Sequence, residues 1–472
     1  MNKVKTGRKI EWFLYIGIFL MPFISCTAAK TNWPDTSHIL AQIKAPVFPE
    51  KIVDITSFGA KSDGSNSTLA INNAIKACHD EGGGTVHVPA GSFYTGAIHL
   101  LSNVNLNLAE GAVLSFSVDP QDYLPLVYTR WEGIDCYNYS PLIYANGQTN
   151  IGLTGKGTLQ GNSTENNWWP WKGKTEFGWN ESLPSQLLPH ARPALEKYNA
   201  NELPVEERRM GDGFYLRPQF VNFVHCKNVL IEDITIENSP FWVVHPLFVE
   251  NLTVRGVRIN SLGPNNDGCD PESCKNVLIE NCRFNTGDDC IAIKSGRNRD
   301  GLKANLPSEN IIVRNCYMEN GHGGVVLGSE ISGGVRNVFV ENCSMDSPEL
   351  DRAIRIKTNS NRGGLVENIY VKNVKIGQVK EAILRINCVY DIKKEGTDTL
   401  YPTIRNVNLS EIDCQSSKYG ILLEGIESHN SIYGIHITQS KFNGVAKGNT
   451  IRNAADVTFD EVYINNKLIL SE

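Results

Sequence analysis

The sequence lacks an excess of positive charge, and beyond its first residues it lacks any long apolar run. Its 45 Lys and Arg residues are outnumbered by 51 Asp and Glu residues, which gives a net charge of −6 and a pI of about 6.0. A nucleic acid is not expected as a partner, because proteins that bind nucleic acids present a basic surface. The apolar stretch at residues 12–24 has no later counterpart that is long enough to span a bilayer.

The first residues are typical of an export signal. Basic residues lie between positions 3 and 9, the apolar stretch follows, and small residues come next. We expect residues 1–25 to be a signal peptide. Two processing outcomes stay open: cleavage before Cys26 with a lipid on its sulfur, or cleavage after Ala29. The mature protein is therefore expected in the periplasm, anchored to the outer membrane by its lipid, or secreted.

The 12 cysteines suggest disulfides in an exported chain. Cys282, Cys316 and Cys343, however, each follow an asparagine in the same local pattern. A cysteine that recurs at one place in a repeat is typical of a small core residue. The pattern therefore predicts mostly free, buried thiols, and a bridge between Cys269 and Cys274 stays open.

From about residue 220 onward, the sequence repeats a short motif in which asparagine is followed by alternating, often β-branched, apolar residues. The marker asparagines are Asn228, Asn251, Asn276, Asn310, Asn337, Asn368 and Asn406, with fainter copies at Asn103 and Asn150. A motif that repeats every 20–40 residues indicates a solenoid, and the alternation of apolar residues indicates strands. Neither the leucine spacing of a leucine-rich repeat nor four strands per unit is present. We predict an all-β, right-handed parallel β-helix over residues 51–472, preceded by a linker at 26–50.

Two segments depart from the repeat. Residues 67–78 have apolar side chains at helical spacing, and a helix there would cap the open end of the hydrophobic column. Residues 162–217 read as a long loop excursion, with tryptophans at Trp168, Trp169, Trp171 and Trp179. These rings either stack on sugars or pack the loop onto the coils, and both interpretations stay open.

Four polar clusters are spaced at about one coil. They occupy residues 265–270, 287–290, 321–323 and 355–357. From Asp267 to Asp288 is 21 residues, and the steps from Asp289 to His322 and from His322 to Arg355 are 33 each. Neighbouring strands lie about 4.8 Å apart, so residues one coil apart should lie side by side. We expect all four clusters on one strip of the coil stack.

The residue types in this strip suit glycoside hydrolysis. That reaction uses one carboxylic acid to protonate the leaving oxygen and a second carboxylate to act on water or on the sugar. Crowded carboxylates raise the pKa of at least one of them, which keeps a proton available. Basic side chains in the same strip can hold the carboxylate of a uronic acid.

The four clusters resemble the signature of glycoside hydrolase family 28, the polygalacturonases: Asn-Thr-Asp, Gly-Asp-Asp, Gly-His-Gly and Arg-x-Lys. Three match without change, and Asn266 replaces the threonine of the first. The resemblance extends to residues 58–64 and 82–86 and so covers nearly the whole chain after the signal. It implies inverting hydrolysis of α-galacturonosidic linkages in pectin, with no metal and no cofactor.

The resemblance also assigns catalytic roles. Asp288 is expected to be the general acid, and Asp267 and Asp289 are expected to activate the water. His322 is expected to hydrogen-bond within the site and to help set the protonation of the acid. Inversion predicts about 6.5–9.5 Å between the acid and base carboxyl groups.

Further residues are expected to contact the substrate. The resemblance assigns Arg355 and Lys357 to the substrate carboxylate, and Asn265 is placed with them in the site. His245 lies 22 residues before Asp267, so it either lines a subsite or is a satisfied buried histidine.

The expected partner is a pectic polysaccharide or an oligogalacturonide, and the chain is expected to be monomeric. The excursion at 162–217 and the insertion between the second and third clusters favour exo action, because each is able to close one end of a cleft. A rhamnogalacturonan hydrolase of the same family, an eliminase similar to pectate lyases, and a non-catalytic carbohydrate-binding β-helix stay open as alternatives.

Overall fold

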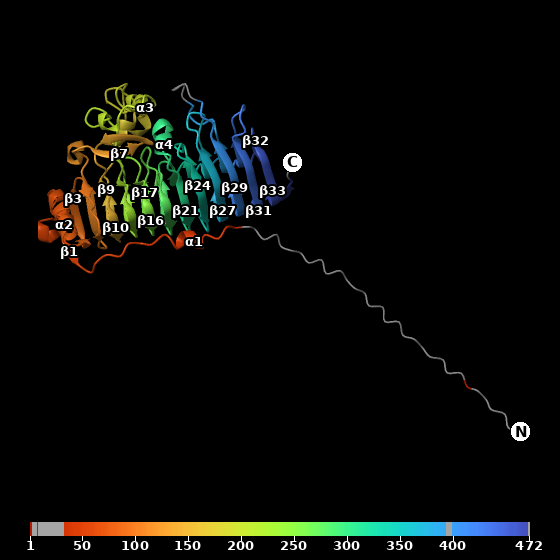
Figure 1. The fold of residues 1–472 in the computed structure, drawn as a ribbon, viewed down its shortest axis with the longest axis horizontal. Helices are drawn as coiled ribbons and strands as arrows, with labels where there is room; N and C mark the ends of the chain where they lie inside the picture. Colours follow the sequence, from red (N-terminus) through yellow and green to blue (C-terminus); the bar gives the residue numbers. More distant parts are fainter. Residues whose placement is uncertain (2–6, 8–32, 393–398, 471–472) are drawn as a thin grey trace. The chain divides into compact units, whose positions relative to one another are not determined.

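In the computed structural model, parallel strands stack coil upon coil into a right-handed β-helix, as predicted (Figure 1). The structure describes residues 33–392 and 399–470, together with Met1 and Gly7. The predicted signal peptide lies almost entirely outside the described residues, and Cys26 lies outside them. The chain from Asp35 onward forms one unit. None of the described helices is both long and apolar enough to cross a membrane.

The coil has three faces. The first face is formed by β1 (Ile52–Asp54), β2 (Gly84–Val88), β5 (Val104–Leu108), β10 (Thr149–Gly155), β13 (Lys227–Glu232), β16 (Glu250–Arg255), β18 (Lys275–Glu280), β21 (Ser308–Arg314) and β24 (Val335–Glu341). The second face is formed by β3 (Gly91–Thr95), β6 (Ala112–Phe116), β11 (Thr158–Gln160), β14 (Thr235–Glu237), β17 (Arg258–Ser261), β19 (Arg283–Thr286), β22 (Tyr317–Met318) and β25 (Ser344–Met345). Both faces continue into the long strands β27 (Leu365–Gln378), β29 (Thr403–Ser416), β31 (Ile432–Phe442) and β33 (Ala455–Ile464), and β34 (Lys467–Ile469) pairs antiparallel with β33.

The third face is interrupted, and the interruption positions the site. It begins with β4 (Ile98–His99), β9 (Ile143–Asn146), β12 (Val221–Val224) and β15 (Val244–Leu247). It resumes with β20 (Ile291–Ile293), β23 (Val325–Gly328), β26 (Arg352–Lys357), β28 (Ala382–Asn387), β30 (Tyr419–Glu424) and β32 (Thr450–Arg452). Between β15 and β20, one coil passes through the face as an irregular segment that is held by isolated bridges, such as Val244 to Cys269 and Cys269 to Ile291. Two prolines, Pro264 and Pro271, lie in this coil and disfavour a regular central strand there.

The marker asparagines form a ladder of side-chain hydrogen bonds, which explains why the motif repeats. Each of the nine has a positive φ between 53° and 65°, a conformation that asparagine tolerates better than most residues. From Asn150 onward, each side-chain amide donates to the Oδ1 of the asparagine one coil earlier, for example Asn337 to Asn310 at 3.1 Å and Asn368 to Asn337 at 3.0 Å. After each asparagine, alternate residues such as Val277 and Ile279 point into the core.

Within the described part of the chain, four α-helices accompany the coils: α1 (Ser37–Leu40), α2 (Thr68–Asp80), α3 (Arg192–Ala200) and α4 (Asn298–Ala304). Helix α2 packs Ile71, Ala74, Ile75 and Cys78 into the core at the N-terminal end of the stack, which confirms the predicted cap. All 11 cysteines within the described residues are free and buried, so no Cys269–Cys274 bridge is present.

Part of the predicted linker packs against the coils. We call residues 35–50 the N-terminal strap. Its helix α1 contacts β18 on the first face, Ile39 is buried, and Gln42 Oε1 accepts a hydrogen bond from the Asn276 side chain at 3.1 Å. The strap therefore belongs to the folded unit.

A separate group of segments stands on the side of the third face. The hairpin β7 (Val127–Trp131) and β8 (Ile134–Asn138) packs beside the excursion, which contains α3 and the short 3₁₀ helices η3 (Trp169–Lys172), η4 (Thr175–Phe177) and η5 (Val205–Glu207). The remaining 3₁₀ helices, η1 (Ile55–Phe58) and η2 (Pro120–Tyr123), lie near the N-terminal coils. Figure 1 shows α3, α4 and β7 grouped together, away from α1.

Candidate active site

Backbone hydrogen bonds bring the first three predicted clusters onto neighbouring coils. The amide of Gly268 donates to the carbonyl of Asp289 at 2.9 Å, and the amide of His322 donates to the carbonyl of Asp288 at 3.0 Å. Asp267, the two consecutive aspartates and His322 therefore lie on three successive coils of the third face. The spacing argument from the sequence placed these residues correctly.

The three aspartates converge. One carboxylate oxygen from each of Asp267, Asp288 and Asp289 lies within 4.8 Å of the others. Gly287 makes this possible by close packing, because a Cβ at that position would lie 2.3 Å from the carbonyl oxygen of Gly263. Glycine is therefore needed here for its small size and not for a positive φ.

The spacing of these oxygens is shorter than the 6.5–9.5 Å that is usual between acid and base groups of inverting glycosidases. It does fit a single bridging water. A hydrogen bond between oxygens is about 2.7–2.8 Å long, so one water is able to contact two carboxylates whose oxygens are 4.8 Å apart.

Each carboxylate has its own cationic neighbour. Lys357 Nζ lies 2.7 Å from Asp289, Lys294 Nζ lies 3.4 Å from Asp267, and His322 Nδ1 lies 2.9 Å from Asp288. Asp267 and Asp289 are buried, and Asp288 keeps 16% of its side chain exposed. The site therefore gathers three carboxylates without leaving them as an uncompensated acidic cluster.

These contacts set the protonation of the site. Burial, followed by the charge of Asp288, raises the pKa of Asp267 to about 7. The charge of Asp288 and its hydrogen bond raise the pKa of His322 to about 9. Burial acts to raise the pKa of Asp288, but the charge and hydrogen bond of His322 and the nearby lysines outweigh it and hold that pKa below its usual range. In the substrate-free protein, the proton shared by this pair therefore resides on His322.

Lys294 also lies close to two further carboxylates, those of Asp270 and Glu330. Besides Asp267, its ammonium lies 3.4 Å from Asp270 and 3.6 Å from Glu330, and 4.5 Å above the ring of Trp242. Neither carboxylate oxygen of Asp270 has a hydrogen-bond partner among the described residues. Burial raises the pKa of Asp270 well above its usual value, which favours its neutral form beside Lys294.

The predicted pair on β26 lies beside Asp289. Lys357 lines the pocket, whereas Arg355 does not, and Arg355 Nη1 is 3.6 Å from Asp289. The ring of Tyr390 lies 5.3 Å from the Arg355 guanidinium and 5.4 Å from the Lys357 ammonium. Both basic residues are thus held against an acid and an aromatic ring.

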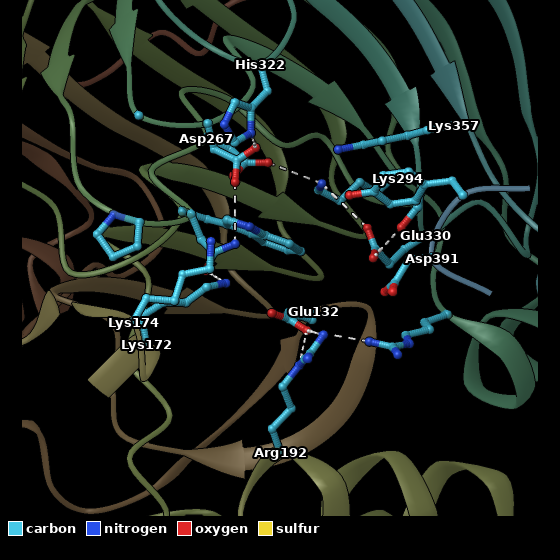
Figure 2. Close-up of a pocket in the computed structure, with 18 of the residues that line it drawn as sticks. Glu132, Lys172, Lys174, Arg192, Asp267, Lys294, His322, Glu330, Lys357 and Asp391 are labelled. Carbon is cyan, nitrogen blue, oxygen red and sulfur yellow. Dashed lines mark hydrogen bonds and ion pairs between the residues drawn. The ribbon is translucent and has the colours of Figure 1, made fainter. Parts of the chain in front are cut away.

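The aspartates open into a cavity of about 590 Å³. Its lining includes Glu132, Lys172, Lys174, Glu176, Phe177, Arg192, Trp242, Asn265, Asp267, Asp288, Lys294, Arg297, His322, Glu330, Lys357, Arg362, Tyr390 and Asp391. The turn between β7 and β8 and the excursion supply one wall, and later coils supply the opposite one. Figure 2 shows the labelled side chains projecting from all sides into one space.

The tryptophans of the excursion do not line this cavity. Trp168 is buried, and the indole of Trp169 donates to the carbonyl of Ser239 at 3.0 Å. Trp171 packs edge-on against Trp168. Trp179 donates to the carbonyl of Leu183 in its own loop. The first three rings therefore anchor the excursion to the coils, and the contributions of the excursion to the pocket are Phe177 and charged side chains.

Asn265 faces Asp288, as placed from the sequence. Its Oδ1 accepts hydrogen bonds from Lys172 at 2.6 Å and Arg217 at 2.9 Å, and its amide nitrogen points towards Asp288 at 3.5 Å. Two cations thus fix the orientation of this amide.

His245 does not reach the pocket, so the structure agrees with the alternative of a satisfied buried histidine and not with a role as a subsite residue. It is fully buried, with Nε2 2.9 Å from Glu272 and Nδ1 3.1 Å from the amide of Asn222. The expected register counted 22 residues back from Asp267. The bridge from Val244 to Cys269 instead aligns His245 with Asp270, 25 residues later.

Several pocket residues were not predicted from the sequence. Lys294 had a signal that could have been used, because a lysine directly follows the short apolar strand at residues 291–293, just after the second cluster. Glu132, Lys172 and Arg192 had none, since only folding of the hairpin and the excursion brings them beside residues that are about 60–160 positions away in the chain.

Comparisons with known proteins agree with this geometry. The family model "Glycosyl hydrolases family 28" matches residues 212–458. A hyperthermoactive exopolygalacturonase from Thermotoga maritima superposes with a TM-score of 0.88 at 41% identity, covering 92% of this chain and 96% of that one. A probable polygalacturonase from Vitis vinifera is 28% identical over 84% of this chain and 75% of its own length. An exo-poly-alpha-D-galacturonosidase from Dickeya chrysanthemi is 27% identical over 88% and 71%.

Proposed function

Because the chain belongs to glycosyl hydrolase family 28 and is therefore a glycosidase, we propose that it is an exo-acting polygalacturonase that removes galacturonate from chain ends of pectin. The observation that carries the proposal is the convergence of Asp267, Asp288 and Asp289 beside basic side chains in one pocket. The resemblance at 41% identity to an exopolygalacturonase supports the exo mode.

In this proposal, Asp288 protonates the glycosidic oxygen, and Asp267 and Asp289 hold and deprotonate the attacking water. The bond between the anomeric carbon and the glycosidic oxygen breaks, and the water oxygen forms the new bond. The water proton passes to the carboxylate pair. Lys357 faces the carboxylate of the substrate from the pocket lining. Arg355 lies behind it, and both cations keep Asp289 ion-paired.

The proton on His322 requires one further step before Asp288 is able to act as the acid. We propose that His322 Nδ1 passes its proton to Asp288 Oδ1 across their 2.9 Å hydrogen bond as substrate displaces water from the pocket. Loss of water disfavours the two separated charges of this pair. Asp288 then donates the proton to the departing sugar.

Product analysis on polygalacturonate tests the function. Exo action is expected to give galacturonic acid alone from the first time point, because an exo-acting enzyme removes one sugar at a time from a chain end. A ladder of oligomers would contradict exo action. No product from polygalacturonate, together with release from a branched pectin, would instead indicate a rhamnogalacturonan hydrolase of the same family.

Inversion is the stereochemical outcome that we propose on the strength of the family. Proton NMR of the first sugar released is expected to show the β anomer before mutarotation. An initial α anomer would mean that one of the closely spaced carboxylates attacks the sugar directly.

Elimination is the second candidate, because three carboxylates within 4.8 Å resemble the ligand set of a Ca²⁺ site. Their pairing with Lys294, His322 and Lys357 argues against it. EDTA is therefore expected to leave the rate unchanged, with no ultraviolet-absorbing unsaturated product. Loss of activity in EDTA that Ca²⁺ restores would favour the eliminase.

We further propose export of the protein, from the pattern of its first 29 residues. Mass spectrometry of the mature chain is expected to locate the new N-terminus at Cys26 with an attached lipid, or just after Ala29. An intact Met1 on the cell-associated protein would contradict export.

A further inference from the structure

Most basic side chains that line the pocket already lie within ion-pair distance of a carboxylate, as Lys294, Lys357 and Arg192 do. Lys172 differs. Within the described ranges, no carboxylate oxygen lies within 4.0 Å of its Nζ, which donates instead to the neutral Oδ1 of Asn265 at 2.6 Å. The pocket therefore contains a lysine whose charge is not neutralised by direct contact.

Arg362 is a second pocket cation without a described carboxylate at that distance, but it is placed differently. It is almost fully buried, and its Nη1 donates to Asn298 at 2.6 Å. Lys172, in contrast, is joined to Asp288 through a single side chain, that of Asn265. Of these two cations, Lys172 is the one linked to the proposed general acid.

The electrostatics of Lys172 fit a site that awaits an anion. Burial lowers the pKa of Lys172 to about 8, and the more distant charges of Glu132 and Asp288 recover only part of the loss. A desolvated ammonium gains more from an incoming carboxylate than an exposed one does, because the two charges attract more strongly where water is excluded. A bound uronate would therefore offset the free-energy cost of the partial burial of Lys172.

The position of Lys172 indicates which sugar it meets. It is the last residue of η3, in the excursion that forms one wall of the pocket. Figure 2 draws Lys172 and Lys357 on opposite sides of the pocket. The bond that Asp288 protonates has one sugar on each side. Because Lys357 faces the carboxylate of one of these sugars in the proposed mechanism, Lys172, across the pocket, faces the other.

We propose that Lys172 binds the carboxylate of the terminal, non-reducing galacturonate and so selects a uronate over a neutral hexose at that subsite. The excursion then supplies specificity as well as a wall. This inference rests on the proposed exo-polygalacturonase function.

The test uses ligands that carry a single sugar, so that only the terminal subsite is probed. Inhibition constants of D-galacturonate and D-galactose are measured against hydrolysis of an aryl α-D-galacturonide, for the unmodified enzyme, K172M and K174M. Lys174 is the matched control, because it lines the same pocket from the same loop but is exposed and already pairs with Glu176 at 3.1 Å.

K172M is expected to weaken inhibition by D-galacturonate about 10- to 100-fold, the effect of losing one charge-assisted hydrogen bond. Inhibition by D-galactose should stay unchanged, and K174M should alter neither constant. K172R should restore most of the preference for galacturonate. If K172M fails to fold by circular dichroism, K172Q replaces it with the same readouts.

Two outcomes would overturn the inference. Equal weakening of both inhibitors by K172M would mean that Lys172 acts only through Asn265 as a positioning residue, and no weakening would mean that it does not meet the sugar. Both are distinct from failure of the proposed function, in which the unmodified enzyme would hydrolyse neither polygalacturonate nor the aryl galacturonide.

Discussion

At the scale of single residues, the site is a balance between crowded acids and their cations. Asp288 is hydrogen-bonded to His322 at 2.9 Å, and Asp267 is the member of the aspartate trio whose pKa is raised by burial. The pKa directions in the free protein alone favour Asp267 as the protonated carboxyl, whereas the family pattern assigns the acid role to Asp288. Substitution of the two residues separates these assignments.

We expect Asp288→Asn to lower kcat on polygalacturonate at least about 100-fold, the typical contribution of general acid catalysis. On an aryl galacturonide with a nitrophenol leaving group the loss should be much smaller, because that group departs without a proton. Asp267→Asn should lose activity on both substrates. The opposite pattern would make Asp267 the acid, and thermal unfolding would verify that both variants are folded.

Asp267 also makes a prediction about stability. A pKa raised from about 3.9 in the unfolded chain to about 7 in the fold means that the folded protein holds this proton more tightly. The associated stability is complete below pH 4 and is lost as the pH rises through 7. Asp267→Asn cannot ionise, so it should be more stable than the original at pH 8, by up to about 4 kcal/mol.

The measurement is a set of thermal unfolding curves between pH 4 and pH 8. The two proteins should converge at the acidic end and separate towards pH 8. A constant difference across the range would show that ionisation of Asp267 is not the cause.

At the scale of elements, the asparagine ladder is the feature that repeats most faithfully. Asn337 shows its two roles: it adopts a φ of 56°, and it exchanges side-chain hydrogen bonds with Asn310 and Asn368. Backbone conformation and side-chain hydrogen bonding at the same turn both favour asparagine, which is why the motif could be recognised in the sequence.

Asn337→Gly and Asn337→Ala should separate the two roles. Both lose the ladder bonds, worth about 0.5–1.5 kcal/mol each. Alanine adds the strain of a left-handed backbone, about 1–2 kcal/mol more, so its unfolding temperature should fall further. Equal effects of the two substitutions would remove backbone conformation from the explanation.

The excursion and the hairpin β7–β8 are the elements that the sequence could not place. Their position depends on buried ion pairs across long separations, such as Arg130 with Glu272 and Arg208 with Asp300. Such long-range ion pairs leave no periodic pattern in the local sequence, so they could not be predicted from it. The coils were predictable because each repeats the turn and the strands of the one before it, and the motif residues followed because coil spacing aligns them. His245 was misplaced because the turn before Asp267 adds residues to one coil.

At the scale of the whole molecule, function and stability use different faces. The pocket opens from the third face, whereas the N-terminal strap lies on the first. Ile39→Ala, which truncates a buried strap residue, should lower the unfolding temperature, since such truncations cost about 2–5 kcal/mol. The ratio kcat/KM should stay unchanged.

Val47→Ala is the control for this prediction, because Val47 lies in the same strap but is 90% exposed. It should change neither quantity. A fall in kcat/KM for Ile39→Ala at temperatures where the protein is folded would instead connect the strap to the pocket.

The strap also determines an order of events during biosynthesis. Gln42 binds Asn276, a residue 234 positions later in the chain. In a chain that leaves the ribosome or an export channel from its N-terminus, the strap emerges among the first residues, yet its docking surface on β18 forms only after more than half of the coils exist. The strap therefore cannot dock before β18 has formed, so its docking marks a late stage of assembly.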